Sequence, residues 1–210
     1  MEAINTKHTI FLLGDSTCAD KAPEAHPETG WGTCFRSFLK DEWTLRNLAV
    51  NGMSTRRFLE HGLFDDFITQ VKPRDYVLIQ FGHNESKEDE RKTEPWTTYS
   101  DNLRYMIERI RDKEANPILI SSIERRRHPV ENTHGEYPMA MEAVAKELDV
   151  PFVNMTDPTR ELYDRLGPEE SKKLFNHAIK EDNSHFSPEG AAVMANMIAN
   201  KLINLPFIKS

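Results

Sequence analysis

The chain has 210 residues, of which 38% are hydrophobic and 29% charged, a composition typical of globular proteins. This length fits a single domain, 1–210, which can bury about 70% of the surface that the unfolded chain exposes. The 34 acidic residues outnumber the 27 basic ones, and the net charge of −7 argues against nucleic acid as a partner.

Apolar, strand-like runs alternate with helical patterns along the chain. The predicted strands are His8–Leu13, Trp43–Val50, Tyr76–Phe81, Pro117–Ser121 and Pro151–Asn154. The predicted helices are Cys34–Lys40, Thr98–Lys113, Met139–Leu148, Asp157–Leu166 and a last one that begins near Pro188. This alternation indicates a mostly parallel sheet covered by helices on both faces, so we expect one α/β sandwich with five strands.

Four short polar blocks stand where predicted strands end or where loops turn. They are Gly14-Asp15-Ser16, Asn51-Gly52, Gly82-His83-Asn84 and Asp182-Asn183-Ser184-His185. The first three follow the first three predicted strands. Because ligands of open α/β sheets bind outside the carboxyl ends of the strands, we expect these blocks to meet at one edge.

Together the blocks hold the groups that ester hydrolysis by a serine needs. Ser16 is the candidate nucleophile, His185 the general base and Asp182 the carboxylate that orients it. The backbone N–H groups of Ser16 and Gly52 and the side chain of Asn84 are candidate donors to an oxyanion. Taken alone, Asp182 could be a turn residue and His185 a surface histidine, but the combination of all four blocks favours catalysis.

The blocks resemble those of the SGNH (GDSL) hydrolase superfamily, whose fold is a flavodoxin-like α/β/α sandwich. Within it, the chain is most similar to rhamnogalacturonan acetylesterases, through matches that span nearly its whole length. The matching segments are Gly14-Asp15-Ser16-Thr17, Gly30-Trp31-Gly32, Asn51-Gly52-Met53-Ser54, Arg56-Arg57-Phe58, Phe81-Gly82-His83-Asn84, Arg125-Arg126-Arg127, Thr133-His134-Gly135 and Asp182-Asn183-Ser184-His185-Phe186. Two departures are Val50-Asn51-Gly52-Met53 in place of a glycine-rich block, and Glu85 where an aspartate is expected.

The resemblance implies a serine carbohydrate esterase that removes O-acetyl groups from pectic galacturonate–rhamnose chains through an acetyl-enzyme. It implies neither a metal nor an organic cofactor. Alternatives are the same chemistry on acetylated xylan, a lysophospholipid or a thioester, and a non-catalytic carbohydrate-binding module. The intact Ser16, Asp182 and His185 argue against a module that only binds.

Five residues in or near the blocks are predicted to contact substrate: Asp15, Trp31, Arg56, His83 and Arg126. Guanidinium groups suit the carboxylates of an acidic sugar chain. Bracing of loops is the alternative role for His83 and for the arginines. The remaining histidines show no metal-ligand spacing and are expected to be core or surface residues.

The chain also carries weak indications of its compartment. Its apolar stretch at Thr9–Leu13 is too short for the core of a signal peptide, so we expect a cytoplasmic protein. The mature form of an exported enzyme is the alternative. No apolar run reaches the length of a transmembrane helix, and Cys18 and Cys34 are expected to be small buried side chains rather than a disulfide or metal site.

Overall fold

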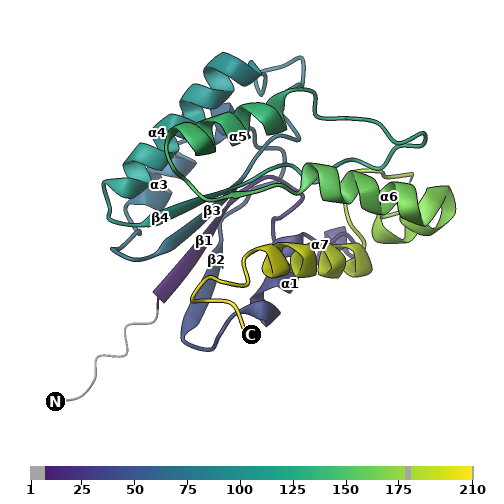
Figure 1. Cartoon of the computed structure of the whole chain (residues 1–210), viewed down its shortest axis with the longest axis horizontal. Coiled ribbons are helices and arrows are strands. Elements are labelled where there is room, and N and C mark those ends of the chain that lie inside the picture. The colour runs from purple at the N-terminus through teal and green to yellow at the C-terminus, as the bar shows by residue number, and fades with distance from the viewer. Residues whose placement is uncertain (1–7, 178–180, 210) are drawn as a thin grey trace.

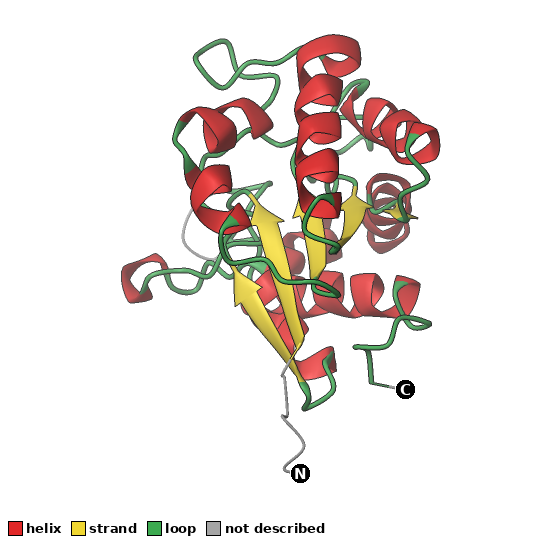
Figure 2. Cartoon of the chain, turned by 90° about the vertical axis from the view of Figure 1, so that its left-hand side faces the viewer, coloured by secondary structure: helices red, strands yellow, loops and turns green. Residues whose placement is uncertain are grey.

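The computed structural model describes residues 8–177 and 181–209 and builds them around one twisted parallel sheet (Figures 1 and 2). Its strands are β1 (His8–Gly14), β2 (Trp43–Asn47), β3 (Tyr76–Gln80), β4 (Asn116–Ile120) and β5 (Phe152–Val153). The strand order is β2-β1-β3-β4-β5, and every pairing is parallel. This is the flavodoxin-like order. The chain adds β2 on one side of β1 and then β3, β4 and β5 on the other side, so the order of strands switches between β1 and β3. The expected fold class is confirmed.

Helices cover both faces of the sheet (Figure 1). One face carries α2 (Thr55–Glu60), α3 (Leu63–Ile68), α4 (Ser100–Arg111) and α5 (Tyr137–Glu147). The other carries α1 (Trp31–Phe35), α6 (Thr156–Glu170) and α7 (Pro188–Lys201). Shorter helical turns lie at Pro23–Ala25, Arg36–Phe38, Pro95–Tyr99 and Ser171–Leu174.

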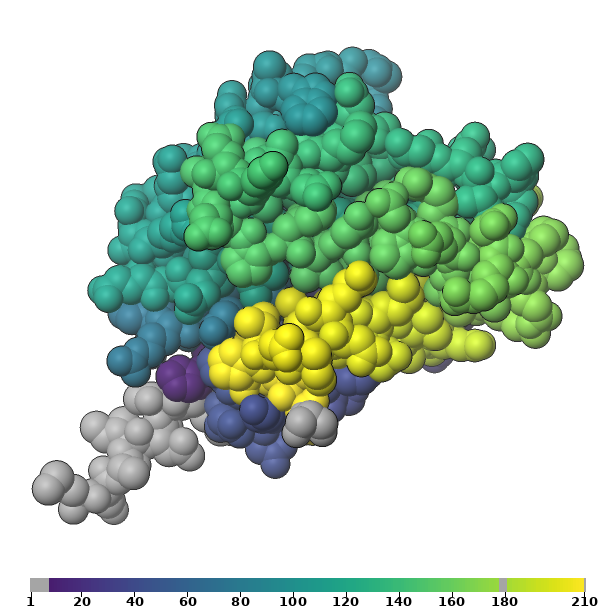
Figure 3. Space-filling model, in the orientation of Figure 1, coloured from purple at the N-terminus to yellow at the C-terminus, as the bar shows by residue number. Residues whose placement is uncertain are grey.

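Side-chain alternation along β1 explains why two layers form. Ile10 and Leu12 face the core under α1, α6 and α7, whereas Phe11 and Leu13 face the core under α2 to α5. All four are buried, so β1 is an interior strand with an apolar face on each side. In Figure 3, the carboxyl-terminal segment in yellow packs closely against the light-green segment that precedes it, and this closes the second layer.

Several predicted boundaries need correction. The helix predicted at Cys34–Lys40 begins earlier, as α1, and continues only as the turn Arg36–Phe38. The second strand ends at Asn47 instead of Val50, and β5 has two residues instead of four. The prediction missed α2 and α3, because six residues are too few to show helical periodicity.

The helix start predicted near Pro188 is confirmed. Ser187 caps α7 by accepting a hydrogen bond from the backbone N–H of Gly190 at 3.1 Å, and Pro188 occupies the first helical position. Both cysteines are free thiols, with Cys18 buried and Cys34 half-buried. In the described part of the chain, no helix combines the length and apolarity that crossing a membrane needs.

Candidate active site

Ser16, His185 and Asp182 form one hydrogen-bonded chain at the carboxyl edge of the sheet. Ser16 Oγ lies 3.0 Å from His185 Nε2, and His185 Nδ1 lies 2.9 Å from Asp182 Oδ2. These residues are 169 positions apart at the extremes, so the fold rather than local sequence brings them together. The distances are those of a nucleophile, its base and an orienting carboxylate.

The Asp182 carboxylate is tied to its own loop as well as to the imidazole. Its Oδ1 accepts hydrogen bonds from the backbone N–H groups of Ser184 at 2.8 Å and His185 at 3.0 Å. Burial acts to raise the pKa of Asp182, but these bonds and the His185 side chain hold it at about 2. Asp182 is therefore ionised at neutral pH and can accept a hydrogen bond from His185 Nδ1–H.

His185 is held between two short extended segments. Phe175 and Phe186 form an antiparallel bridge, and the backbone N–H of Asn176 donates to His185 O at 2.9 Å. The capped start of α7 follows directly. The backbone of His185 is thus fixed by its pairing with the Phe175–Asn176 segment.

The turn after β1 presents Ser16. Asp15 Oδ1 accepts from the backbone N–H of Thr17 at 2.9 Å and from Thr17 Oγ1 at 2.8 Å, which closes a tight turn. Asp15 is fully buried and Ser16 half-buried. Burial raises the pKa of Asp15, while its bonds to Thr17 oppose this. The Asp15 carboxylate is thus enclosed and shapes the turn, and its predicted substrate contact stays a prediction.

The loop after β2 brings Gly52 alongside this turn. The backbone N–H of Val50 donates to Gly14 O at 3.0 Å, so the loop continues to follow β1 beyond the end of the sheet. Gly52 has φ of 76°, and a Cβ there would meet no atom within 4 Å. Glycine is therefore favoured by its backbone conformation rather than by lack of space.

Asn84 is joined to the same loop. Its Nδ2 donates to Met53 O at 2.9 Å, next to Gly52. The Glu85 carboxylate accepts from the backbone N–H groups of Thr55 at 2.7 Å and Asn84 at 3.1 Å, and burial raises its pKa to about 8. Glu85, the departure noted in the sequence, thus links the two loops that bear Gly52 and Asn84.

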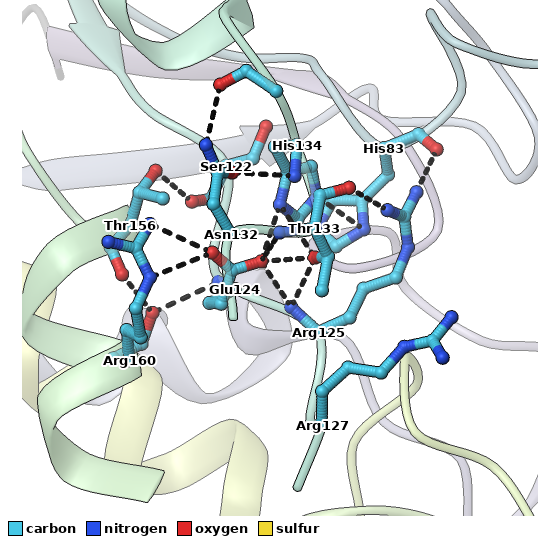
Figure 4. Close-up of polar contacts among 12 residues, drawn as sticks. His83, Ser122, Glu124, Arg125, Arg127, Asn132, Thr133, His134, Thr156 and Arg160 are labelled. Atoms are coloured by element: carbon cyan, nitrogen blue, oxygen red, sulfur yellow. Dashed lines mark hydrogen bonds and ion pairs between the residues drawn. The ribbon is translucent and has the colours of Figure 1, made fainter. Parts of the chain in front are cut away.

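The Gly82–Asn84 segment is anchored from the other side by a buried polar cluster (Figure 4). Glu124 Oε1 lies 2.9 Å from His134 Nδ1, and His134 Nε2 lies 3.3 Å from His83 Nδ1. Arg125 Nη2 donates to His83 O at 2.6 Å, and Arg160 Nη2 donates to the other carboxylate oxygen of Glu124, Oε2, at 3.0 Å.

The protonation of this cluster follows from its contacts. Burial alone would raise the pKa of Glu124, but hydrogen bonds from His134, Thr133 and Arg160 hold it at about 2. Burial lowers the pKa of both His134 and His83, so both rings are neutral. Because a carboxylate can only accept, His134 Nδ1 carries the proton, and its Nε2 accepts from His83 Nδ1.

This arrangement supports one of the two roles weighed for His83. The residue is 5% exposed, and it braces the loop that bears Asn84 through both its ring and its carbonyl. The predicted substrate contact of His83 stays a prediction. At Gly82, with φ of 143°, a Cβ would lie 1.9 Å from Ser122 Oγ, so this bend needs glycine.

Two further residues that were predicted to contact substrate have buried side chains, and their substrate contacts stay predictions. Trp31 has no exposed surface, and its Nε1 donates to Gln80 Oε1 at 2.8 Å in the core. Arg126 is 7% exposed, and its guanidinium donates to Ser171 Oγ at 2.9 Å, Asn183 Oδ1 at 2.7 Å and Pro168 O. It therefore braces the loop that carries Asp182.

Arg56 alone of the five predicted contacts stays exposed. Its Nε lies 2.8 Å from Glu60 Oε1, one helical turn away on α2. A contact between Arg56 and substrate stays a prediction. Within residues 8–177 and 181–209, no group of three or more His, Cys, Asp or Glu side chains could hold a metal ion.

Sequence reasoning missed Lys21, which links three parts of the site. Its Nζ donates to Ser16 O at 2.6 Å and to Asn51 Oδ1 at 2.8 Å, and lies 2.8 Å from Glu28 Oε1. The side chain is 5% exposed. A single lysine in a polar loop has no spacing or pattern that would distinguish it in the sequence.

These features define a class: a parallel α/β protein with a serine–histidine–aspartate chain at the carboxyl edge of its sheet. The sequence matches the model of the GDSL-like Lipase/Acylhydrolase family over residues 12–193. It is 40% identical to "Rhamnogalacturonan acetylesterase RhgT" of Bacillus subtilis (strain 168), across 93% of this chain and 90% of that protein.

Two solved structures share the fold. The structure of the YxiM protein of Bacillus subtilis superimposes with a TM-score of 0.84 at 23% identity, covering 94% of this chain and 56% of that one. A catalytic mutant of Axe2, an acetylxylan esterase from Geobacillus stearothermophilus, gives a TM-score of 0.68 at 18% identity, covering 97% of each chain.

The chain belongs to the GDSL-like lipase/acylhydrolase family, the SGNH hydrolases, as the sequence blocks predicted. It is a carboxylic-ester hydrolase. The predicted fold, family and enzyme class are thereby confirmed.

Proposed function

We propose that this enzyme removes O-acetyl groups from rhamnogalacturonan, the pectic chain of galacturonate and rhamnose, or from its oligosaccharides. The observation that supports this substrate is the 40% identity to a rhamnogalacturonan acetylesterase over nearly the whole length of both proteins. The same chemistry on acetylated xylan is the second candidate, because an acetylxylan esterase shares the fold.

The proposed mechanism uses the hydrogen-bonded chain at the sheet edge. His185 Nε2, 3.0 Å from Ser16 Oγ, takes the hydroxyl proton as the oxygen attacks the acetyl carbonyl. The backbone N–H groups of Ser16 and Gly52 and the Nδ2 of Asn84 donate to the resulting oxyanion. His185 then protonates the departing sugar oxygen, which leaves as a hydroxyl. Water, deprotonated by His185, attacks the acetyl-enzyme, which releases acetate and restores the Ser16 hydroxyl.

Asp182 supports both proton transfers. Its ionised carboxylate accepts a hydrogen bond from Nδ1–H, with Nδ1 and Oδ2 2.9 Å apart, which leaves Nε2 free to accept from Ser16. It also stabilises the imidazolium that forms in each step. No step of this mechanism requires a metal or an organic cofactor.

Acetate release from acetylated rhamnogalacturonan and from acetylated xylan, assayed side by side, tests the substrate. Faster release from xylan would overturn the rhamnogalacturonan proposal. Compared with wild type, Ser16→Ala and His185→Ala should each lower kcat on p-nitrophenyl acetate by roughly 10⁴–10⁶-fold. Near-normal turnover by pure Ser16→Ala would refute the assigned nucleophile, and a fluorophosphonate probe should label wild type but not that variant.

The predicted cytoplasmic location stays a prediction. Residues 1–7, which come before the Thr9–Leu13 stretch, lie outside the described residues. Fractionation of cells that produce the protein, followed by assay of acetate release in each fraction, tests it.

A further inference from the structure

A cavity of about 490 Å³ lies between the loop after Ser16, helix α1 and the start of α7. Its walls combine charged, polar and proline side chains, including Lys21, Pro23, Glu28, Thr33, Arg36 and Pro188. This volume is within the range of cavities that bind small molecules. None of the residues predicted from the sequence to contact substrate lines it.

The cavity wall is attached to the triad from both sides. Lys21 donates to the carbonyl of Ser16 and to the side chain of Asn51, which precedes Gly52. On the opposite side, the backbone N–H of Thr29 donates to the carbonyl of Phe186 at 3.0 Å, directly after His185. The cavity therefore lies beside the two segments that carry Ser16 and His185.

The cations of the cavity are each paired with a carboxylate. Lys21 pairs with Glu28, and both side chains are largely buried. Arg36 Nη2 lies 2.5 Å from Asp20 Oδ2, and its Nη1 donates to Leu45 O at 2.7 Å. Asp20 Oδ1 also accepts from Thr33 Oγ1 at 2.7 Å.

This pairing selects against an acidic ligand. The charges of Lys21 and Glu28 cancel, as do those of Arg36 and Asp20, and a carboxylate that entered would face Asp20 and Glu28 without gaining an unpaired lysine or arginine. A neutral ring needs no such pairing. The proline rings and Ala22 offer an apolar surface to the C–H face of such a ring. The paired polar groups of the wall can form hydrogen bonds with its hydroxyls.

We propose that this cavity binds a neutral sugar ring next to the acetylated residue of the substrate. The inference rests on the proposed function. In an alternating galacturonate–rhamnose chain the neutral ring is rhamnose, whose methyl group in place of a hydroxymethyl suits the proline surface. The cavity then distinguishes rhamnogalacturonan from a chain made only of galacturonate.

Filling the cavity tests this assignment. Ala22 lines it, is exposed and makes no side-chain hydrogen bond, so Ala22→Trp inserts bulk without removing a contact. The matched control is Ala143→Trp, the same change at an exposed position of α5. We expect Ala22→Trp to raise KM for acetylated rhamnogalacturonan oligosaccharides at least about tenfold, equivalent to 1.4 kcal/mol of binding. Activity on p-nitrophenyl acetate should stay at the control level.

Three outcomes separate this proposal from the function on which it rests. Wild-type enzyme that releases no acetate from rhamnogalacturonan overturns the proposed function. Wild-type enzyme that does so, with an unchanged KM in Ala22→Trp, overturns the cavity assignment. Equal loss on the polymer and on p-nitrophenyl acetate also overturns it, because the variant would then have disturbed Ser16.

A second variant tests the charge argument in the opposite direction. Asp20→Asn removes the carboxylate partner of Arg36 without touching the triad. It should increase acetate release from acetylated polygalacturonate relative to rhamnogalacturonan, since a freed guanidinium can bind a carboxylate. An unchanged ratio would overturn the claim that charge pairing selects the neutral ring.

Discussion

Asn84→Ala separates the catalytic role of this amide from its structural role. Loss of one oxyanion donor costs about 10²–10³ in kcat, or about 2.7–4 kcal/mol of the barrier. The variant also loses the 2.9 Å bond from Nδ2 to Met53 O. One such bond contributes about 0.5–1.5 kcal/mol to folding, which in a chain of this size lowers Tm by about 1–6 °C.

The structure offers a control for the second effect. Asn102 Nδ2 donates to Thr55 Oγ1 at 3.1 Å, so Asn102→Ala also removes an asparagine bond to the segment that follows Met53. Both variants should lose a few degrees in Tm, but Asn84→Ala alone should lose kcat on p-nitrophenyl acetate, at little change in KM. Unchanged kcat with a raised KM in Asn84→Ala, or an equal loss of kcat in the control, would refute the oxyanion role.

Three further predictions follow from the charged groups around the site. Folding lowers the pKa of Asp182 from 3.8 to about 2, which stabilises the folded state by about 2 kcal/mol above pH 4. This stabilisation is lost as the pH falls through 2. In Asp182→Asn the urea midpoint of unfolding should therefore depend less on pH in this acid range. Glu124→Ala should lower the free energy of unfolding by about 3–5 kcal/mol, measured in urea, because His134 and Arg160 lose a fully buried acceptor. Arg126→Ala should lower Tm and reduce activity on polymer and p-nitrophenyl acetate alike, whereas a loss confined to the polymer would support its predicted substrate contact.

The elements of the site that the sequence predicted share one physical property. Ser16, Gly52 and Asn84 each follow a strand, and strand ends can be located from apolar runs and the glycines that interrupt them. The carboxyl ends of parallel strands lie at the same edge of the sheet, so residues that directly follow different strands lie close together. For these residues, correct strand assignment was sufficient to predict their convergence.

Substrate contacts cannot be predicted in the same way, because they depend on whether each side chain is buried or exposed. Trp31 and Arg126 belong to motifs shared with esterases, yet one packs in the core and the other binds three oxygen atoms within the protein. A motif indicates that a residue matters without indicating which way its side chain points. The cavity beside Lys21 is likewise built by segments whose contact depends on the tertiary fold.

The arginines near the site bind groups within the protein, which leaves a protein of net charge −7 with little to attract an acidic chain. Arg56 pairs with Glu60, Arg57 with Glu90, and Arg125 and Arg126 donate to groups within the protein. Long-range attraction is therefore weak, and discrimination must come from short-range fit. If a neutral ring in the cavity provides that fit, the preference for rhamnogalacturonan over polygalacturonate should persist from low ionic strength to 1 M salt, where the screening length falls to about 3 Å. A preference that disappears with added salt, measured by acetate release from both polymers, would return the arginines to the substrate site.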